Sequence, residues 1–268
     1  MYNQLGALSP LDGRYASSVK DLNVFFSEAA LMRYRVYIEI EYLIALSLEK
    51  KIKEFPTITK NQVDDLRKVY QKFDMDSAKK IKEIEAETNH DVKAIEYYLQ
   101  QKTNKSFHPW IHFALTSEDV NNLSYSLMWQ HGLKQVYIPL LKSVDKELKK
   151  LAKRFKNAPM LSMTHGQPAT PTTFGKELAV FQSRLNRKVQ LLKEQELFGK
   201  FSGATGNWSA HLAAYPDVNW TRFSSRFIRS IAVSYTHLRA HEPRHDVVCR
   251  LLLEKKKGGG GGGGGGGG

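Results

Sequence analysis

The chain has 268 residues, of which 41 % are hydrophobic, enough to bury a core in one large or two modest domains. A formal net charge of +13 permits contact with nucleic acid, a membrane surface or anionic metabolites without choosing among them, and the single cysteine, Cys249, excludes an internal disulfide. The sequence has no signal-peptide pattern and no apolar stretch near the ~20 residues that span a bilayer. A cytoplasmic protein is therefore expected.

Turn signals dominate the first twenty residues, at Ser9-Pro10 and Asp12-Gly13, and predict an extended arm. Arg14 and Tyr15 follow the second turn directly. They can form an ordinary surface loop, or the arginine can be placed for an anionic ligand. Apolar residues at steps of three to four then predict a helix over about 21–51.

The next segment contains three shorter predicted helices. The first covers about 59–73 with Thr59 as its cap, and the second is capped by Asp76. This second helix is interrupted at Thr88-Asn89-His90-Asp91, whose residues favour caps and turns. Asp91 can start the third helix, over 92–101. His90 is therefore expected at an exposed helix junction, which makes it a candidate site residue.

A pair of hydroxyl residues precedes the longest predicted helix. Thr116 or Ser117 can cap this helix, and Glu118 and Asp119 favour its positive end. The same N–H groups and hydroxyls can bind an anion, although simple capping explains them as well. The helix continues over about 120–155 and exceeds about 45 Å at ~1.5 Å per residue. Such a length is typical of a helical bundle that packs against other subunits. Pro139 is expected to kink it or to shift its local hydrogen bonds.

The segment 161–175 reads LSMTHGQPATPTTFG and contains His165. Thr170 is expected to cap a helix over about 171–196, with Pro171 in its first turn. His165 would then lie on a short rigid loop against the start of that helix, a placement that suits proton transfer. A loop histidine that only hydrogen-bonds its neighbours is the competing interpretation.

These elements are helices and loops, and no strand of useful length is predicted, so the expected fold class is all-α. We expect an N-terminal helical domain over 1–110 and an incomplete helical bundle over 111–233. Residues 234–268 end in three lysines and eleven glycines and resemble translated sequencing-adapter read-through. We interpret 234–268 as a non-native tail, with a polyglycine linker as the alternative. The histidines and Cys249 within the tail are accordingly not taken as a zinc site.

The remaining candidate chemistry consists of two loop histidines, a hydroxyl pair and an arginine near the N-terminus. This set suits acid–base chemistry on an anionic substrate. No metal site, phosphate-binding glycine loop or dinucleotide motif is present, so no cofactor is expected. A basic helical interaction module that binds RNA is the alternative function. The lysines, however, are scattered along helical faces and form no single stripe.

Five segments, in order, resemble the adenylosuccinate lyase family of the fumarase/aspartase superfamily. They are SPLDGRY (9–15), TNHDVKAIEYYL (88–99), IHFALTSEDVNNLS (111–124), LSMTHGQPATPTTFGKE (161–177) and GATGNWSAHLAAYP (203–216). The resemblance implies an all-α homotetramer that needs no cofactor. It also implies elimination of fumarate from adenylosuccinate, giving AMP, and from the succinyl-aminoimidazole-carboxamide ribotide of purine synthesis.

The resemblance also assigns roles to the residues selected above. His165 matches the family's general acid, Asn89, His90 and Asp91 match a substrate-contacting loop, Thr116 and Ser117 match the succinyl-carboxylate site, and Arg14 and Tyr15 match a nucleotide-binding pair. The implied partner is a purine nucleotide, with no nucleic acid and no membrane.

Two features depart from the family pattern. Met163 stands where a basic residue is expected before the Thr-His pair. The family's loop of the form Ser-Ser-x-Met-Pro-x-Lys-x-Asn-Pro, which supplies the serine base, is absent. We therefore expect the chain as written to be the N-terminal portion of such an enzyme, with an acid but no base. Alone it should be inactive, and its exposed bundle faces should make it aggregate.

Overall fold

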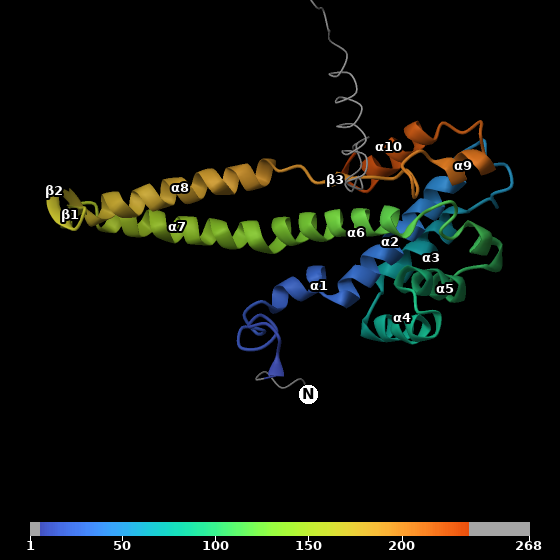
Figure 1. The fold of residues 1–268 in the computed structure, drawn as a ribbon, viewed down its shortest axis with the longest axis horizontal. Helices are drawn as coiled ribbons and strands as arrows, with labels where there is room; N and C mark the ends of the chain where they lie inside the picture. The colour runs from blue at the N-terminus through green and yellow to red at the C-terminus, as the bar shows by residue number, and fades with distance from the viewer. Residues whose placement is uncertain (1–5, 236–268) are drawn as a thin grey trace, which may run out of the picture.

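The computed structural model describes residues 6–235 (Figure 1). The predicted non-native tail therefore lies outside the described residues from position 236 onward. No helix in the described part is long and apolar enough to cross a membrane.

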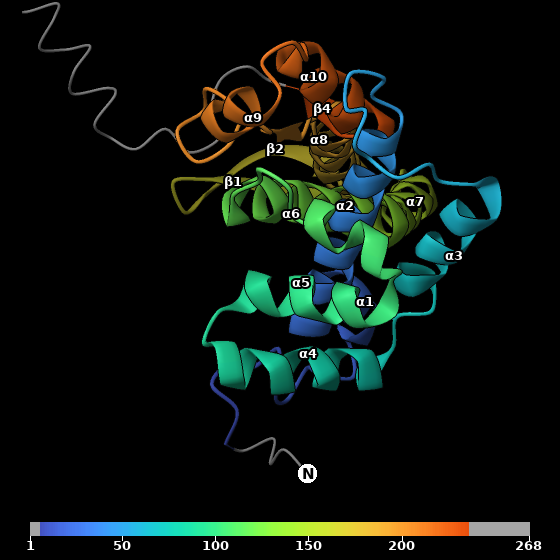
Figure 2. The same ribbon diagram turned by 90° about the vertical axis from the view of Figure 1, so that its right-hand side faces the viewer.

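The N-terminal part is built around α2 (Glu28–Ser47), which runs through its centre (Figure 2). Ser27 is extended and its side chain accepts a hydrogen bond from the N–H of Ala30 at 3.1 Å. This cap divides the helix expected over 21–51 into a 3-10 turn (Lys20–Leu22), α1 (Asn23–Phe26) and α2. Twelve α2 residues are buried, because other helices surround it. Two of the twelve, Arg35 and Glu39, are charged.

Three short helices follow: α3 (Lys60–Gln71), α4 (Met75–Thr88) and α5 (Asp91–Lys102). Thr59 caps α3 as predicted, and its backbone N–H donates to the Gln62 side-chain oxygen at 2.9 Å. The cap predicted for α4 is wrong by two residues. Asp74, rather than Asp76, accepts from the N–H of Ser77, at 2.8 Å.

The long helix predicted over 120–155 is confirmed. It begins as α6 (Ser117–Gly132), passes through a π-helical turn, η4 (Leu133–Tyr137), and ends as α7 (Ile138–Arg154). Pro139 is the second residue after the π turn. Because proline lacks an N–H and its ring clashes with the carbonyl four residues earlier, the wider turn accommodates it. Residues 117–154 span about 57 Å at 1.5 Å per residue.

A β-hairpin forms where the sequence predicted only a loop and a helix start. It pairs β1 (Pro159–Thr164) with β2 (Gln167–Thr173), and Leu161 lies opposite Pro171. The helix start predicted at Thr170-Pro171 is therefore wrong, as is the predicted absence of strands. Thr173 caps the following helix instead, accepting from the N–H of Lys176 at 3.2 Å.

That helix, α8 (Phe174–Glu194), packs along α7, so the two form a rod that projects from the rest of the chain (Figure 1). A Cβ atom on Gly175 would lie 2.4 Å from the carbonyl oxygen of Ala152, so the close approach of the two helices requires glycine here.

The chain then returns to α2. A short parallel pair joins β3 (Phe198–Gly199) to β4 (Ser234–Tyr235). The segment after β3 contains α9 (Ser209–Ala214), and α10 (Trp220–Ser230) follows. Tyr42 of α2 meets the rings of Phe201, Phe223 and Phe227 at centroid distances of 5.1, 6.0 and 5.7 Å. These contacts place 198–235 on the face of α2 opposite α4 and α5 (Figure 2).

The predicted all-α class is confirmed, with the hairpin as its main exception. The division at residue 110 stays a prediction.

Candidate functional site

The helix junction at 88–91 is formed by local backbone chemistry. Asn89 ends α4 with a left-handed φ of 51°, a conformation that asparagine tolerates well. His90 then caps α5, because its Nδ1 accepts a hydrogen bond from the N–H of Lys93 at 3.1 Å. A neutral His90 therefore carries its proton on Nε2. The ring is exposed, so the Nε2–H can donate to a ligand.

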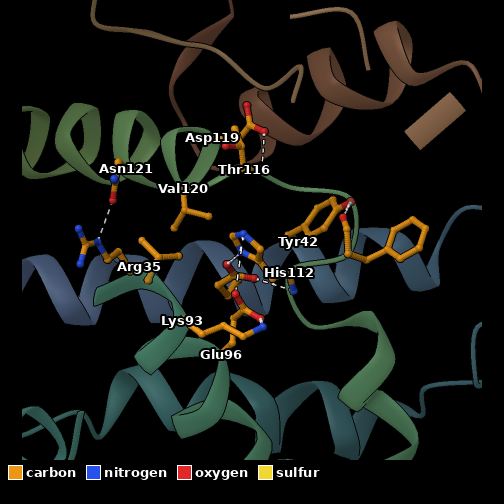
Figure 3. A network of polar contacts seen from close by, with 12 residues as sticks. Arg35, Tyr42, Lys93, Glu96, His112, Thr116, Asp119, Val120 and Asn121 are labelled. Atoms are coloured by element: carbon orange, nitrogen blue, oxygen red, sulfur yellow. Dashed lines mark hydrogen bonds and ion pairs between the residues drawn. The ribbon is translucent and has the colours of Figure 1, made fainter. Parts of the chain in front are cut away.

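A buried arginine fixes this junction to two other helices. Arg35 of α2 donates to the Asp91 carboxylate at 2.6 Å and, through Nε, to Asn121 of α6 at 2.9 Å (Figure 3). Burial alone would raise the pKa of Asp91, but the charge and hydrogen bond of Arg35 outweigh it and hold this pKa below its usual value. Asp91 thus stays ionised, and its position relative to α6 is set by Arg35.

Thr116 and Ser117 lie at the start of α6. Thr116 is extended, and its backbone N–H donates to Asp119 at 3.2 Å, while Ser117 is the first helical residue. The predicted helix start is confirmed to within one residue. Both hydroxyl residues are half-buried, so they remain accessible to a ligand. The positive end of the α6 helix dipole favours an anion here.

His112 is a site residue that the sequence reasoning missed. Its backbone N–H and its Nδ1 both contact the fully buried carboxylate of Glu39, at 3.1 and 2.5 Å. Its Nε2 lies 4.0 Å from Glu96, whose other oxygen accepts from Lys93 at 2.7 Å (Figure 3). Burial alone would lower the pKa of His112, but the charge of Glu39 and their hydrogen bond raise it above the ordinary value. A cationic imidazole is thus favoured beside the Thr116 segment.

The signal for this network was present in the sequence. Arg35 and Glu39 are one helical turn apart in a segment that is otherwise largely apolar. Charged residues are seldom buried without partners, so these two side chains indicated contacts from elsewhere in the chain. The partners, Asp91 and His112, could not be identified from spacing alone.

Arg14 and Tyr15 do not join this group. They lie on the exposed arm before α1, where the guanidinium stands over the tyrosine ring at 5.4 Å. Their predicted nucleotide contact stays a prediction.

His165 lies at the far end of the rod from the other candidates (Figure 1). With Gly166 it forms the two-residue loop of the hairpin, and both residues have positive φ, 49° and 74°. Such a loop is typical of a type I′ turn. The ring is exposed, and its Nδ1 is 3.0 Å from the Thr164 hydroxyl. The α6–α7 helix, about 57 Å long, separates His165 from Thr116 within one chain.

The His90 Nε2–H and the Thr116 and Ser117 hydroxyls are the donors that the junction and the α6 start offer to an anionic ligand. Among residues 6–235, no group of three or more His, Cys, Asp or Glu side chains could hold a metal ion.

Comparison with solved structures identifies the class of fold. The chain superposes on a fumarate lyase from Mesorhizobium sp. BNC1 with a TM-score of 0.69 at 20 % identity, covering 87 % of this chain and 53 % of that one. A β-carboxy-cis,cis-muconate cycloisomerase from Acinetobacter calcoaceticus sp. ADP1 gives 0.67 at 18 % identity, covering 88 % and 54 %. Residues 13–248 match the sequence model of the family described as Lyase, and the chain belongs to that family.

Within the family, the chain is similar to adenylosuccinate lyases. It is 40 % identical to that of Escherichia coli (strain K12) over 254 residues, which covers 93 % of this chain and 56 % of the relative. It is 44 % identical to that of Dictyostelium discoideum over 248 residues, covering 88 % and 53 %. The resemblance seen in the five sequence segments is thus confirmed. The chain spans about half the length of the curated relatives it matches.

Proposed function

We propose that the full-length protein cleaves adenylosuccinate to AMP and fumarate, and the succinyl-aminoimidazole-carboxamide ribotide in the same way. A base removes a proton from the carbon beta to the departing nitrogen. The C–N bond breaks, the double bond of fumarate forms, and an acid protonates the nitrogen. The similarity to adenylosuccinate lyases over 93 % of the chain carries this proposal. A cytoplasmic location belongs to the same proposal.

The site at the start of α6 suits the succinyl group of this substrate. The Thr116 and Ser117 hydroxyls and the first N–H groups of α6 would hold a carboxylate. His90 would donate from Nε2, since its Nδ1 is occupied by the N–H of Lys93.

The general acid must then come from another copy of the chain. A substrate at Thr116 is out of reach of His165 on the same chain, because the rod separates them. Apolar side chains are exposed along α7 and α8: Leu140, Val144, Phe181 and Leu191. Burying such a surface against other copies is favourable, at ~25 cal/mol per Å². We therefore propose a homotetramer in which the hairpin of one subunit completes the site of another.

Subunit complementation tests both parts of the proposal. His165→Gln and Ser117→Ala full-length variants are each expected to lose at least about 100-fold in kcat/KM for adenylosuccinate, in line with the loss of an acid or a substrate-binding group. Tetramers that contain both variants should regain activity, because some sites then combine an intact His165 with an intact Ser117. Mixing two preparations of the same variant is the control.

Different results would contradict the proposed contact between subunits and the proposed substrate. Mixed tetramers that form and stay inactive would show that His165 and Ser117 do not meet across subunits. A wild-type enzyme that cleaves argininosuccinate rather than adenylosuccinate would refute the proposed substrate.

A further inference from the structure

The glycine-rich segment 199–207, GKFSGATGN, binds directly to α6 although about 80 residues separate them in the chain. Asn122 forms two hydrogen bonds with the backbone of Lys200, accepting from its N–H at 2.8 Å and donating to its carbonyl at 3.0 Å. One turn earlier in α6, Asp119 accepts from the N–H groups of Ser202 and Gly203 at 3.1 and 3.0 Å. The segment is thus held by side chains of α6.

Asp119 is the centre of this arrangement. Its side chain is fully buried and accepts from three backbone N–H groups, those of Thr116, Ser202 and Gly203. The ammonium group of Lys200 lies 3.1 Å away and also donates to the Gly203 carbonyl at 2.6 Å. A buried carboxylate is costly unless it is paired and hydrogen-bonded, and here both conditions are met.

One oxygen of Asp119 joins the segment to the candidate carboxylate site. Oδ2 accepts from the N–H of Thr116 at 3.2 Å and from that of Gly203 at 3.0 Å. The two nitrogen atoms therefore lie within about 6 Å of each other, a consequence of sharing one acceptor. The substrate-facing end of α6 and the start of the glycine segment are thus neighbours.

From Gly203 the chain forms an exposed turn, here called the glycine turn (residues 203–206). Gly203 and Gly206 have φ values of 76° and 78°, and the N–H of Gly206 points to the Gly203 carbonyl at 3.4 Å. Ala204 and Thr205, at its tip, are exposed. A Cβ on Gly203 would meet nothing within 4 Å, so glycine is needed there for its conformation and not for space.

We propose that the glycine turn is a second wall of the carboxylate site at Thr116, and that Asp119 is the positioning residue that fixes this wall. The ligand is the succinyl carboxylate of the substrate, so this inference rests on the proposed function. Asp119 itself is buried beneath the site and acts through Thr116 and Gly203. Without it, the turn and the start of α6 lose their shared acceptor.

Asp119→Asn in the full-length enzyme is the first test. Asparagine keeps the shape but replaces one acceptor oxygen with an NH2 group, which faces N–H donors. We expect KM for adenylosuccinate to rise at least about 10-fold, with a smaller change in kcat, because substrate binding loses a fixed wall. Ser124→Ala is the matched control. It removes another buried polar group of α6, one that binds only the Val120 carbonyl at 2.8 Å. It should leave KM unchanged.

Gly203→Ala keeps the proposal testable if Asp119→Asn does not fold. It strains the turn without a steric clash, and it should raise KM in the same direction. Folded Asp119→Asn and Gly203→Ala tetramers with wild-type KM would overturn the inference, even if their melting temperatures fall. If wild-type enzyme does not cleave adenylosuccinate at all, the proposed function fails instead.

Discussion

The guanidinium of Arg35 and the carboxylate of Asp91 form a 2.6 Å ion pair that fixes the start of α5 to the central helix. The same guanidinium holds Asn121 in α6 at 2.9 Å. One side chain therefore sets the relative position of the His90 junction and the α6 start. Its planar fork of donors suits this double contact.

Arg35→Lys should not preserve this geometry, because a lysine ammonium cannot bind Asp91 and Asn121 at once as the planar guanidinium does. We expect kcat/KM for adenylosuccinate to fall at least about 10-fold, or about 1.4 kcal/mol of transition-state binding. Steady-state kinetics on the full-length enzyme measure this. Arg67→Lys is the matched control. Arg67 of α3 forms an ion pair with Glu41 of α2 at 2.9 Å, and neither residue contacts Asp91 or Asn121. Equal effects of the two substitutions would contradict the assigned role.

The Glu39–His112 pair predicts a loss of stability with rising pH. The pKa of His112 is raised in the folded state, so the stabilising charge is fully present below the unfolded value of ~6.5 and disappears as pH rises through the folded value. Melting temperatures of wild type and Glu39→Gln should therefore differ most near pH 6. The difference should narrow as the pH is raised above neutrality. A gap that stays constant from pH 6 to 9 would rule out this ionisation.

The burial of His211 predicts that stability is lost as the pH falls, the opposite of the effect of His112. His211 is buried beside Phe201 and Trp220, its Nδ1 has no hydrogen-bond partner within residues 6–235, and burial lowers its pKa to about 4. Between about pH 6.5 and pH 4 the unfolded chain binds a proton at this histidine that the folded chain does not. The free energy of unfolding therefore falls by about 1.4 kcal/mol for each unit by which the pH is lowered. His211→Phe should flatten the acid side of the melting-temperature profile. An unchanged profile would show that other groups control it.

A substitution at Gly175 is expected to lower the stability of the rod alone. A Cβ there would clash with the backbone of Ala152 and Lys156, at 2.4 and 2.6 Å. Gly175→Ala should therefore destabilise the α7–α8 packing by about 1–3 kcal/mol, the usual cost of overpacking. In hydrogen exchange, the substitution should speed the opening of α7 and α8 relative to wild type and leave that of α2 unchanged. Gly6→Ala, where nothing lies within 4 Å, is the control.

Local sequence signals predicted much of the helical fold. Thr59, and Thr116 or Ser117, were predicted as helix caps because these hydroxyl residues precede helical patterns, and the structure has Thr59 and Thr116 in these positions. The α6–α7 helix was predicted from its long run of apolar residues, despite Pro139. These features depend on residues close together in the chain.

The hairpin at 159–173 and the His112 network were missed for different reasons. Thr170-Pro171 has the chemistry of a helix start, but Thr173 has it too, and cross-strand pairing of Leu161 with Pro171 decided between them. His112 depends on Glu39, 73 residues away. Of the predicted site, the structure brings His90, Asp91, Thr116 and Ser117 to one region through Arg35, and it places His165 and the arm elsewhere.

The rod formed by α7 and α8 also determines which sites a defective chain would affect. In the proposed tetramer, a chain with a faulty hairpin would keep its own site at Thr116 and disable that of a neighbour, because the hairpin that carries His165 lies at the far end of the rod. Expressed together with normal chains, such a variant would act as a dominant inhibitor, with an effect that grows with its share of the subunits. Dilution to the point of dissociation would abolish catalysis while every individual chain stayed folded.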